Sequence, residues 1–176
     1  MHLSRLASIA AIAVILLATA CNKDKNAPAG NSNAPGPLKY KASMTPAASG
    51  DYDGTKGIAA DSGFGNTDII LAKDCPSFSC ADVSGSSLKT DKLKTACPKG
   101  RFLVIEHKGP VKAGTKATMD SVVQAESTGG AMGLMIGDAK TKEVEYLSAG
   151  PPVTAKLTLK ADDAFEGVVA LTVCPK

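Results

Sequence analysis

Hydrophobic and polar residues alternate with a period of two near the end of the chain. From Val153 to Lys160, apolar side chains occupy every second position and Thr or Lys fills the positions between them. A period of two over eight residues is the geometry of a β-strand with one buried face. A polar run at 161–164 and an apolar run at 166–174 follow, so we predict a β-hairpin over 153–174.

Shorter apolar segments separated by turns occupy the rest of the second half of the chain. Residues 102–107 are almost continuously apolar, which is expected of a strand that is covered on both faces. Turns rich in Gly, Pro and Asp recur about every 8–15 residues, a spacing typical of antiparallel sandwiches and barrels. Further strands are predicted at 68–73, 116–126 and 143–146, and in 116–126 we expect one face to hold Ala117, Met119, Ser121, Val123 and Ala125.

These patterns predict an all-β domain over residues 51–176. The expected architecture is an antiparallel β-sandwich, and a small closed β-barrel is the alternative. The one stretch that favours a short helix is 86–96, where Lys and Leu replace the β-branched residues of the strands.

An apolar stretch from Leu6 to Ala20 follows a short positively charged start. Its fifteen residues would form a helix of about 22 Å, which is shorter than the roughly 30 Å hydrocarbon core of a bilayer. This length favours a cleaved secretory signal over residues 1–20 rather than a membrane span.

The run Leu17-Ala18-Thr19-Ala20-Cys21 resembles the lipobox of bacterial lipoproteins, with Ala18 at a position where Leu is the commoner residue. The resemblance implies cleavage before Cys21 and attachment of acyl chains such as palmitate to its thiol. Asn22, rather than Asp, follows the cysteine, and in this class that implies the outer membrane. A plain secretory signal that ends near a cysteine is the alternative.

Residues 22–50 are rich in Pro, Gly, Ala, Asn and Ser, with Leu38, Tyr40 and Met44 as the bulky apolar residues. Such a composition rarely buries enough surface to offset the entropy of ordering the chain. We therefore predict that residues 21–50 form a lipid-anchored, disordered tether. A strand hidden near residues 38–42 is the alternative.

Composition narrows the class of partner. The chain is 44% hydrophobic and 21% charged, which is too apolar for a wholly disordered protein. Its net charge is +3, and Arg101 is the only Arg beyond the predicted signal. Because readout of phosphates and bases relies on Arg, we expect no nucleic-acid partner.

Four cysteines remain besides Cys21: Cys75, Cys80, Cys97 and Cys174. In an exported protein an even number predicts two intramolecular disulfides. The short Pro-containing loop between Cys75 and Cys80 favours a bond between these two, which leaves Cys97 with Cys174. The pairing Cys75–Cys97 with Cys80–Cys174, and the crossed pairing, stay open. The spacings do not fit the paired thiolates of a structural zinc site, so no metal is expected.

His107 is the only histidine beyond the predicted signal, and it follows Glu106 at the end of a predicted strand. We expect it at the surface of a strand end. One alternative makes it the general base of a small envelope hydrolase, although the chain lacks the G-x-S-x-G and S-x-x-K motifs. Another alternative is a metal or copper carrier in which Met132, Met135 and His107 bind the ion, because thioether sulfur is a soft ligand. Core packing is the ordinary role of such methionines.

No catalytic constellation is visible in the sequence. The expected function is therefore a lipid-anchored bacterial envelope protein whose extracytoplasmic β domain is a non-enzymatic binding or structural module. We expect a monomer without a cofactor, attached to the membrane through Cys21 and facing an unidentified protein or envelope polymer. The densest basic cluster is expected to be a solvated face, with contact to anionic headgroups or polymer as the alternative, and consists of Lys89, Lys92, Lys94 and Lys99.

Overall fold

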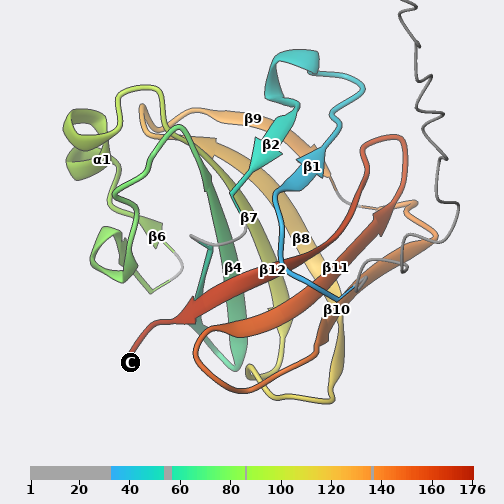
Figure 1. Cartoon of the computed structure of the whole chain (residues 1–176). Helices are drawn as coiled ribbons and strands as arrows, with labels where there is room; N and C mark the ends of the chain where they lie inside the picture. The colour runs from blue at the N-terminus through green and yellow to red at the C-terminus, as the bar shows by residue number, and fades with distance from the viewer. Residues whose placement is uncertain (1–32, 54–56, 86, 136) are drawn as a thin grey trace, which may run out of the picture. The chain divides into compact units, whose positions relative to one another are not determined.

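The computed structural model describes residues 33–53, 57–85, 87–135 and 137–176. Within these residues the chain forms twelve strands, one α-helix and two 3-10 helices (Figure 1). The all-β prediction is confirmed, and the helix expected within 86–96 is α1 (Thr90–Ala96). The strands are β1 (Leu38–Tyr40), β2 (Gly50–Tyr52), β3 (Gly57–Gly63), β4 (Asn66–Lys73), β5 (Val83–Ser84), β6 (Ser87–Leu88), β7 (Arg101–Lys108), β8 (Lys116–Glu126), β9 (Ala131–Met135), β10 (Thr141–Tyr146), β11 (Val153–Lys160) and β12 (Phe165–Val173).

Seven strands close into a barrel, so the predicted sandwich is wrong and its barrel alternative is confirmed. The order is β10-β11-β12-β3-β4-β7-β8, and β10 pairs with β8 to complete the circle. The first part of the long strand β8 pairs with β10, and its last part pairs with β9, which is an extra strand. Closure removes exposed strand edges. Alternation along a strand is the same in a sandwich and in a barrel, so the pattern could not separate the two.

The barrel wall is mixed rather than purely antiparallel. β12 and β3 run parallel and pair over only three residues. Where β3 does not reach, the Gly36 N–H donates to the carbonyl of Val168 in β12 at 3.0 Å. On the other side, the Asp53 N–H donates to the carbonyl of Ala72 in β4 at 3.3 Å. The antiparallel pair β1–β2 therefore fills the gap between β12 and β4.

This arrangement corrects the predicted tether, because residues 38–50 belong to the domain. Leu38 is 0% exposed, and Tyr40 and Tyr52 are buried with it. The Tyr40 ring meets the rings of Tyr52 and Phe165 edge-on, with centroids 6.2 and 6.3 Å away. The alternative of a strand near 38–42 is confirmed, and the domain begins before residue 51. The predicted signal peptide, Cys21 and residues 22–32 lie outside the described residues.

β8 contains a β-bulge at Asp120. Met119 and Ser121 face consecutive residues of β7, so Asp120 has no partner on that strand. A bulge exchanges the two faces of its strand. Beyond it the buried positions are Val122 and Gln124. The predicted shared face over 117–125 is therefore wrong after Met119.

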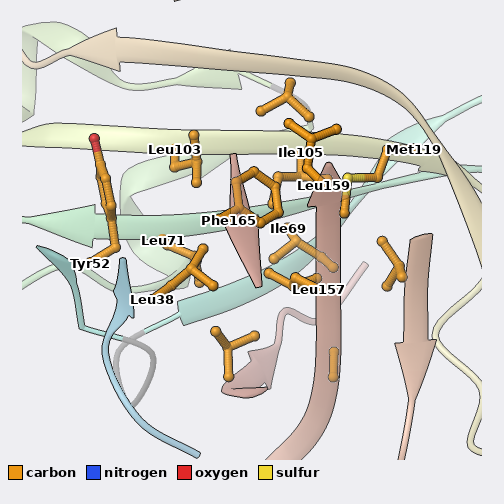
Figure 2. Packing of buried hydrophobic residues seen from close by; sticks show 14 of the residues in the cluster. Leu38, Tyr52, Ile69, Leu71, Leu103, Ile105, Met119, Leu157, Leu159 and Phe165 are labelled. Atoms are coloured by element: carbon orange, nitrogen blue, oxygen red, sulfur yellow. The ribbon is translucent and has the colours of Figure 1, made fainter. Parts of the chain in front are cut away.

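Inward-facing side chains fill the barrel and form what we call the inner core. The alternation predicted for 153–160 is confirmed, because Val153, Ala155, Leu157 and Leu159 are all buried. Figure 2 shows side chains from opposite walls pointing toward one another, among them Ile69, Leu71, Leu103, Ile105, Leu157 and Leu159.

A second, smaller cluster lies outside the barrel, and we call it the outer core. It forms where residues 74–100, which include α1 and the β5–β6 pair, cover the outer face of β3, β4 and β7 (Figure 1). Phe78 packs on Phe102 with ring centroids 5.1 Å apart, and Leu93 of α1 is buried beside them. β7 is thus covered on both faces, as its continuous apolar run predicted. No helix in the described part of the chain is long and apolar enough to cross a membrane.

Candidate functional site

Two disulfides fasten the outer core. Cys75 follows β4 and bonds to Cys97 at the end of α1, with Cα atoms 5.1 Å apart. Cys80 begins a 3-10 helix and bonds to Cys174 after β12, with Cα atoms 5.4 Å apart. The predicted number of disulfides is confirmed, but the favoured pairing is wrong and the first alternative is right. Loop length favoured a bond between Cys75 and Cys80. In the fold, however, the end of α1 lies beside the end of β4, and the 3-10 helix lies beside the end of β12, so each cysteine of the loop bonds to a different partner.

His107 lies inside the barrel, so the predicted surface position is wrong. Its ring is 0% exposed. Nδ1 lies 3.1 Å from the carbonyl of Lys108, which can only accept, so Nδ1 carries the proton. Nε2 then accepts a hydrogen bond from the Tyr146 hydroxyl at 2.6 Å. Burial lowers the pKa of His107 and raises the pKa of Tyr146, so both groups are neutral within the inner core.

The positions of the methionines give no support to the copper alternative. Met119 is buried in the inner core, and Met132 packs against it as a partly buried side chain. Of Met135 only the backbone is described. Among the described residues, no three His, Cys, Asp or Glu side chains are grouped so that they could hold a metal ion.

The basic cluster is partly neutralised within the domain. Lys92 pairs with Asp82 at 3.2 Å, and Lys94 pairs with Asp91 at 3.2 Å. The Lys89 ammonium donates to a backbone carbonyl at 3.1 Å. These contacts favour the solvated-face interpretation of the cluster over a polymer-binding one.

A pair of carboxyl groups on the outer face of the barrel is the site that sequence reasoning missed. Asp68 of β4 and Glu106 of β7 are direct partners in the antiparallel ladder. The Cβ atoms of such partners lie about 5 Å apart. Asp68 is only 2% exposed, whereas Glu106 is half-buried and reaches solvent.

Two neighbouring side chains donate hydrogen bonds to Glu106. Asn66 Nδ2 donates to Glu106 Oε1 at 2.6 Å, and the Ser121 hydroxyl donates to Oε2 at 3.5 Å. Burial, with a smaller contribution from the charge of Glu106, raises the pKa of Asp68 to about 7. At pH 7 the Asp68 carboxyl is therefore about half protonated.

A carboxyl group with a pKa near 7 can take up or release a proton under physiological conditions. Glu106 was visible in the sequence as the neighbour of His107, and Asp68 as the first residue of a predicted strand. Their meeting depends on the pairing of β4 with β7, and no motif or spacing reports that pairing. The site could therefore be found only after the strand register was known.

No family model, curated protein or solved structure matches this chain.

Proposed function

We propose that this chain is a lipid-anchored protein of the bacterial envelope whose β-barrel domain is a non-enzymatic binding or structural module outside the cytoplasm. Acyl chains on Cys21 would hold it in the membrane, and Asn22 favours the outer membrane as its location. The barrel would act as a monomer that faces a protein or an envelope polymer.

The observation that carries this proposal is the pairing of Cys75, Cys80, Cys97 and Cys174 into two disulfides. Disulfides persist in the periplasm and at the cell surface and are rare in the reducing cytosol. Export is also what the apolar N-terminal stretch predicts. Two independent parts of the chain thus support the same compartment.

The filled barrel interior favours a binding surface on the outside of the domain. Side chains from every strand of the barrel meet in the inner core. The hydrolase alternative needs His107 beside a nucleophile and a substrate, but the ring is enclosed with Tyr146. The copper alternative gains no support from Met132, which packs against the inner core. These observations favour a non-enzymatic role.

Acylation of Cys21 tests the proposal. The wild-type protein should incorporate labelled palmitate in its own cells and partition into detergent. Cys21→Ser should lose both properties and keep the circular dichroism spectrum of the barrel. Asn22→Ser, the adjacent substitution, is the matched control and should still be acylated. A wild-type protein that is freely soluble in the periplasm with an unmodified Cys21 would contradict the proposal.

A further inference from the structure

Phe64 occupies a position that neither the turn nor the core explains. Gly63 pairs with Asn66, so Phe64 and Gly65 form a two-residue hairpin turn between β3 and β4. Both have positive φ, 52° for Phe64 and 82° for Gly65. Turns of this kind favour Asn-Gly, and a bulky aromatic residue in the left-handed region is sterically disfavoured. The Phe64 side chain is nevertheless fully exposed, at 104%.

The loop between β7 and β8 lies against this turn. The Gly109 N–H donates to the carbonyl of Gly65 at 2.8 Å, and the Thr67 hydroxyl donates to the carbonyl of Gly109 at 2.8 Å. Lys108 ends β7 and Lys112 lies within this loop, and both are exposed. Neither lysine forms an ion pair with any residue that the structure describes. Two free positive charges therefore accompany the aromatic tip.

The surface beside the turn is partly apolar. A hollow of about 260 Å³ is lined by residues that include Gly65, Pro110, Val111 and Val173, and Val173 is 48% exposed. Asp61, a carboxylate in the same hollow, is already paired with Lys176 at 2.6 Å. The end of the barrel around Phe64 thus combines apolar surface with two exposed lysines that form no ion pair with any described residue.

We propose that this end of the barrel, with Phe64 at its tip and Lys108 and Lys112 beside it, docks onto the surface of an anionic phospholipid bilayer. Aromatic side chains are favoured at the level of the headgroups, and lysines attract their phosphates. The inference rests on the proposed lipid anchor. Eleven residues lie between Cys21 and Asn33, and this stretch spans at most about 43 Å, so an acylated chain keeps the domain close to lipid.

A single tryptophan can report the docking, because the chain contains no Trp. Mature, acylated Phe64→Trp protein is reconstituted into phosphatidylglycerol vesicles and into phosphatidylcholine vesicles. On phosphatidylglycerol we expect a blue shift of the Trp emission relative to detergent-free buffer and quenching by brominated acyl chains. High salt, or Lys108→Glu with Lys112→Glu, should reduce both signals because it weakens the attraction to the anionic surface.

Met44→Trp is the matched control. Met44 is 94% exposed. Ser43 beside it bonds to the turn before the start of β12, whereas Phe64 lies near Val173 at the end of the same strand. The two positions therefore belong to different ends of the barrel. The emission of this control should stay that of a solvated residue on both vesicles.

Three outcomes for the Phe64→Trp protein would overturn the proposal: an emission that stays solvated on phosphatidylglycerol, an equal shift on phosphatidylcholine, or a shift without lipid that grows with protein concentration. The last result would indicate a second copy of the chain. Palmitate labelling of the same sample reports the anchor separately, so the failure of one idea is distinguishable from the failure of the other.

Discussion

The inner and outer cores of this domain are held together in different ways. The inner core receives buried side chains from all seven barrel strands and from β1 and β2. The outer core rests on one face of β3, β4 and β7 and on residues 74–100, a stretch with little regular structure. Among the residues that the structure describes, both disulfides lie at the outer core and no cysteine belongs to the inner core.

The difference shows that each core offsets the conformational entropy lost on folding in its own way. Burial grows with the size of a core, so the large inner core is stabilised mainly by apolar surface removed from water. A small cluster under a long loop buries too little, and a covalent bond offsets the deficit by restricting the unfolded chain. The two regions should therefore respond differently to thiol removal and to cavity formation.

Removing one disulfide should produce the largest effect. Cys80→Ser with Cys174→Ser opens a bond between residues 94 apart in sequence, and Cys75→Ser with Cys97→Ser opens one between residues 22 apart. The chain-entropy relation gives losses of about 4.7 and about 3.4 kcal/mol in the free energy of unfolding. Urea unfolding of the mature protein measures both. A smaller loss for the longer link would contradict this account of the outer core.

Leu38→Ala should cost about 3 kcal/mol, the usual penalty for a cavity left by a fully buried leucine. The same urea titration measures it. Lys39→Ala is the matched control, because its exposed side chain lies between two buried ones, and its effect should stay within about 0.5 kcal/mol. Equal small effects would mean that residues 38–40 do not belong to the inner core.

Asp68→Asn should change how stability depends on pH. The pKa of Asp68 is raised to about 7, so between about pH 4 and 7 the folded protein binds more protons than the unfolded chain. Through this group, stability falls as pH rises across that range. Asn removes the slope, and at pH 8 it should raise the free energy of unfolding by about 1–3 kcal/mol. A slope in Asp68→Asn that stays parallel to that of the wild type would refute the raised pKa of Asp68.

Phe64→Asn should have the smallest effect and should be stabilising. Asn tolerates the left-handed conformation that Phe64 adopts, so we expect a gain of about 0.5–1 kcal/mol. Met44→Asn, another exposed apolar position, should be close to neutral. Thermal unfolding compares the two. A destabilised Phe64→Asn would show that the phenyl ring contributes to folding, which would remove the reason to seek a ligand for it.

The sequence predicted the strands whose hydrophobic pattern alone indicates how many of their faces are buried. The alternation in 153–160 and the continuous run at 102–107 correspond to one and two covered faces, and the structure has both. The predicted tether was wrong because Leu38 and Tyr40 also pack against β12, more than a hundred residues away in the sequence, which local composition does not report. The bulge at Asp120 likewise exchanges the buried and exposed faces of β8, and no Gly or Pro in the sequence marks its position.

The candidate site was less predictable than the fold. The even number of cysteines predicted two disulfides, but their pairing follows from where α1 and β12 lie. The sequence singled out His107 as a candidate functional residue, but its hydrogen-bond partner Tyr146 is 39 residues away in the sequence. Asp68 and Glu106 meet only through the register of β4 and β7. Each of these contacts is long-range, and none leaves a local pattern.

Disulfide mapping under non-reducing conditions tests the central claim most directly, namely an exported barrel whose outer core is held by two specific links. Trypsin with chymotrypsin cleaves at Phe78, between Cys75 and Cys80, and separates the two cysteines. The account predicts one linked pair of peptides that contains Cys75 with Cys97 and another that contains Cys80 with Cys174. Free thiols, or peptides that join Cys97 to Cys174, would contradict it.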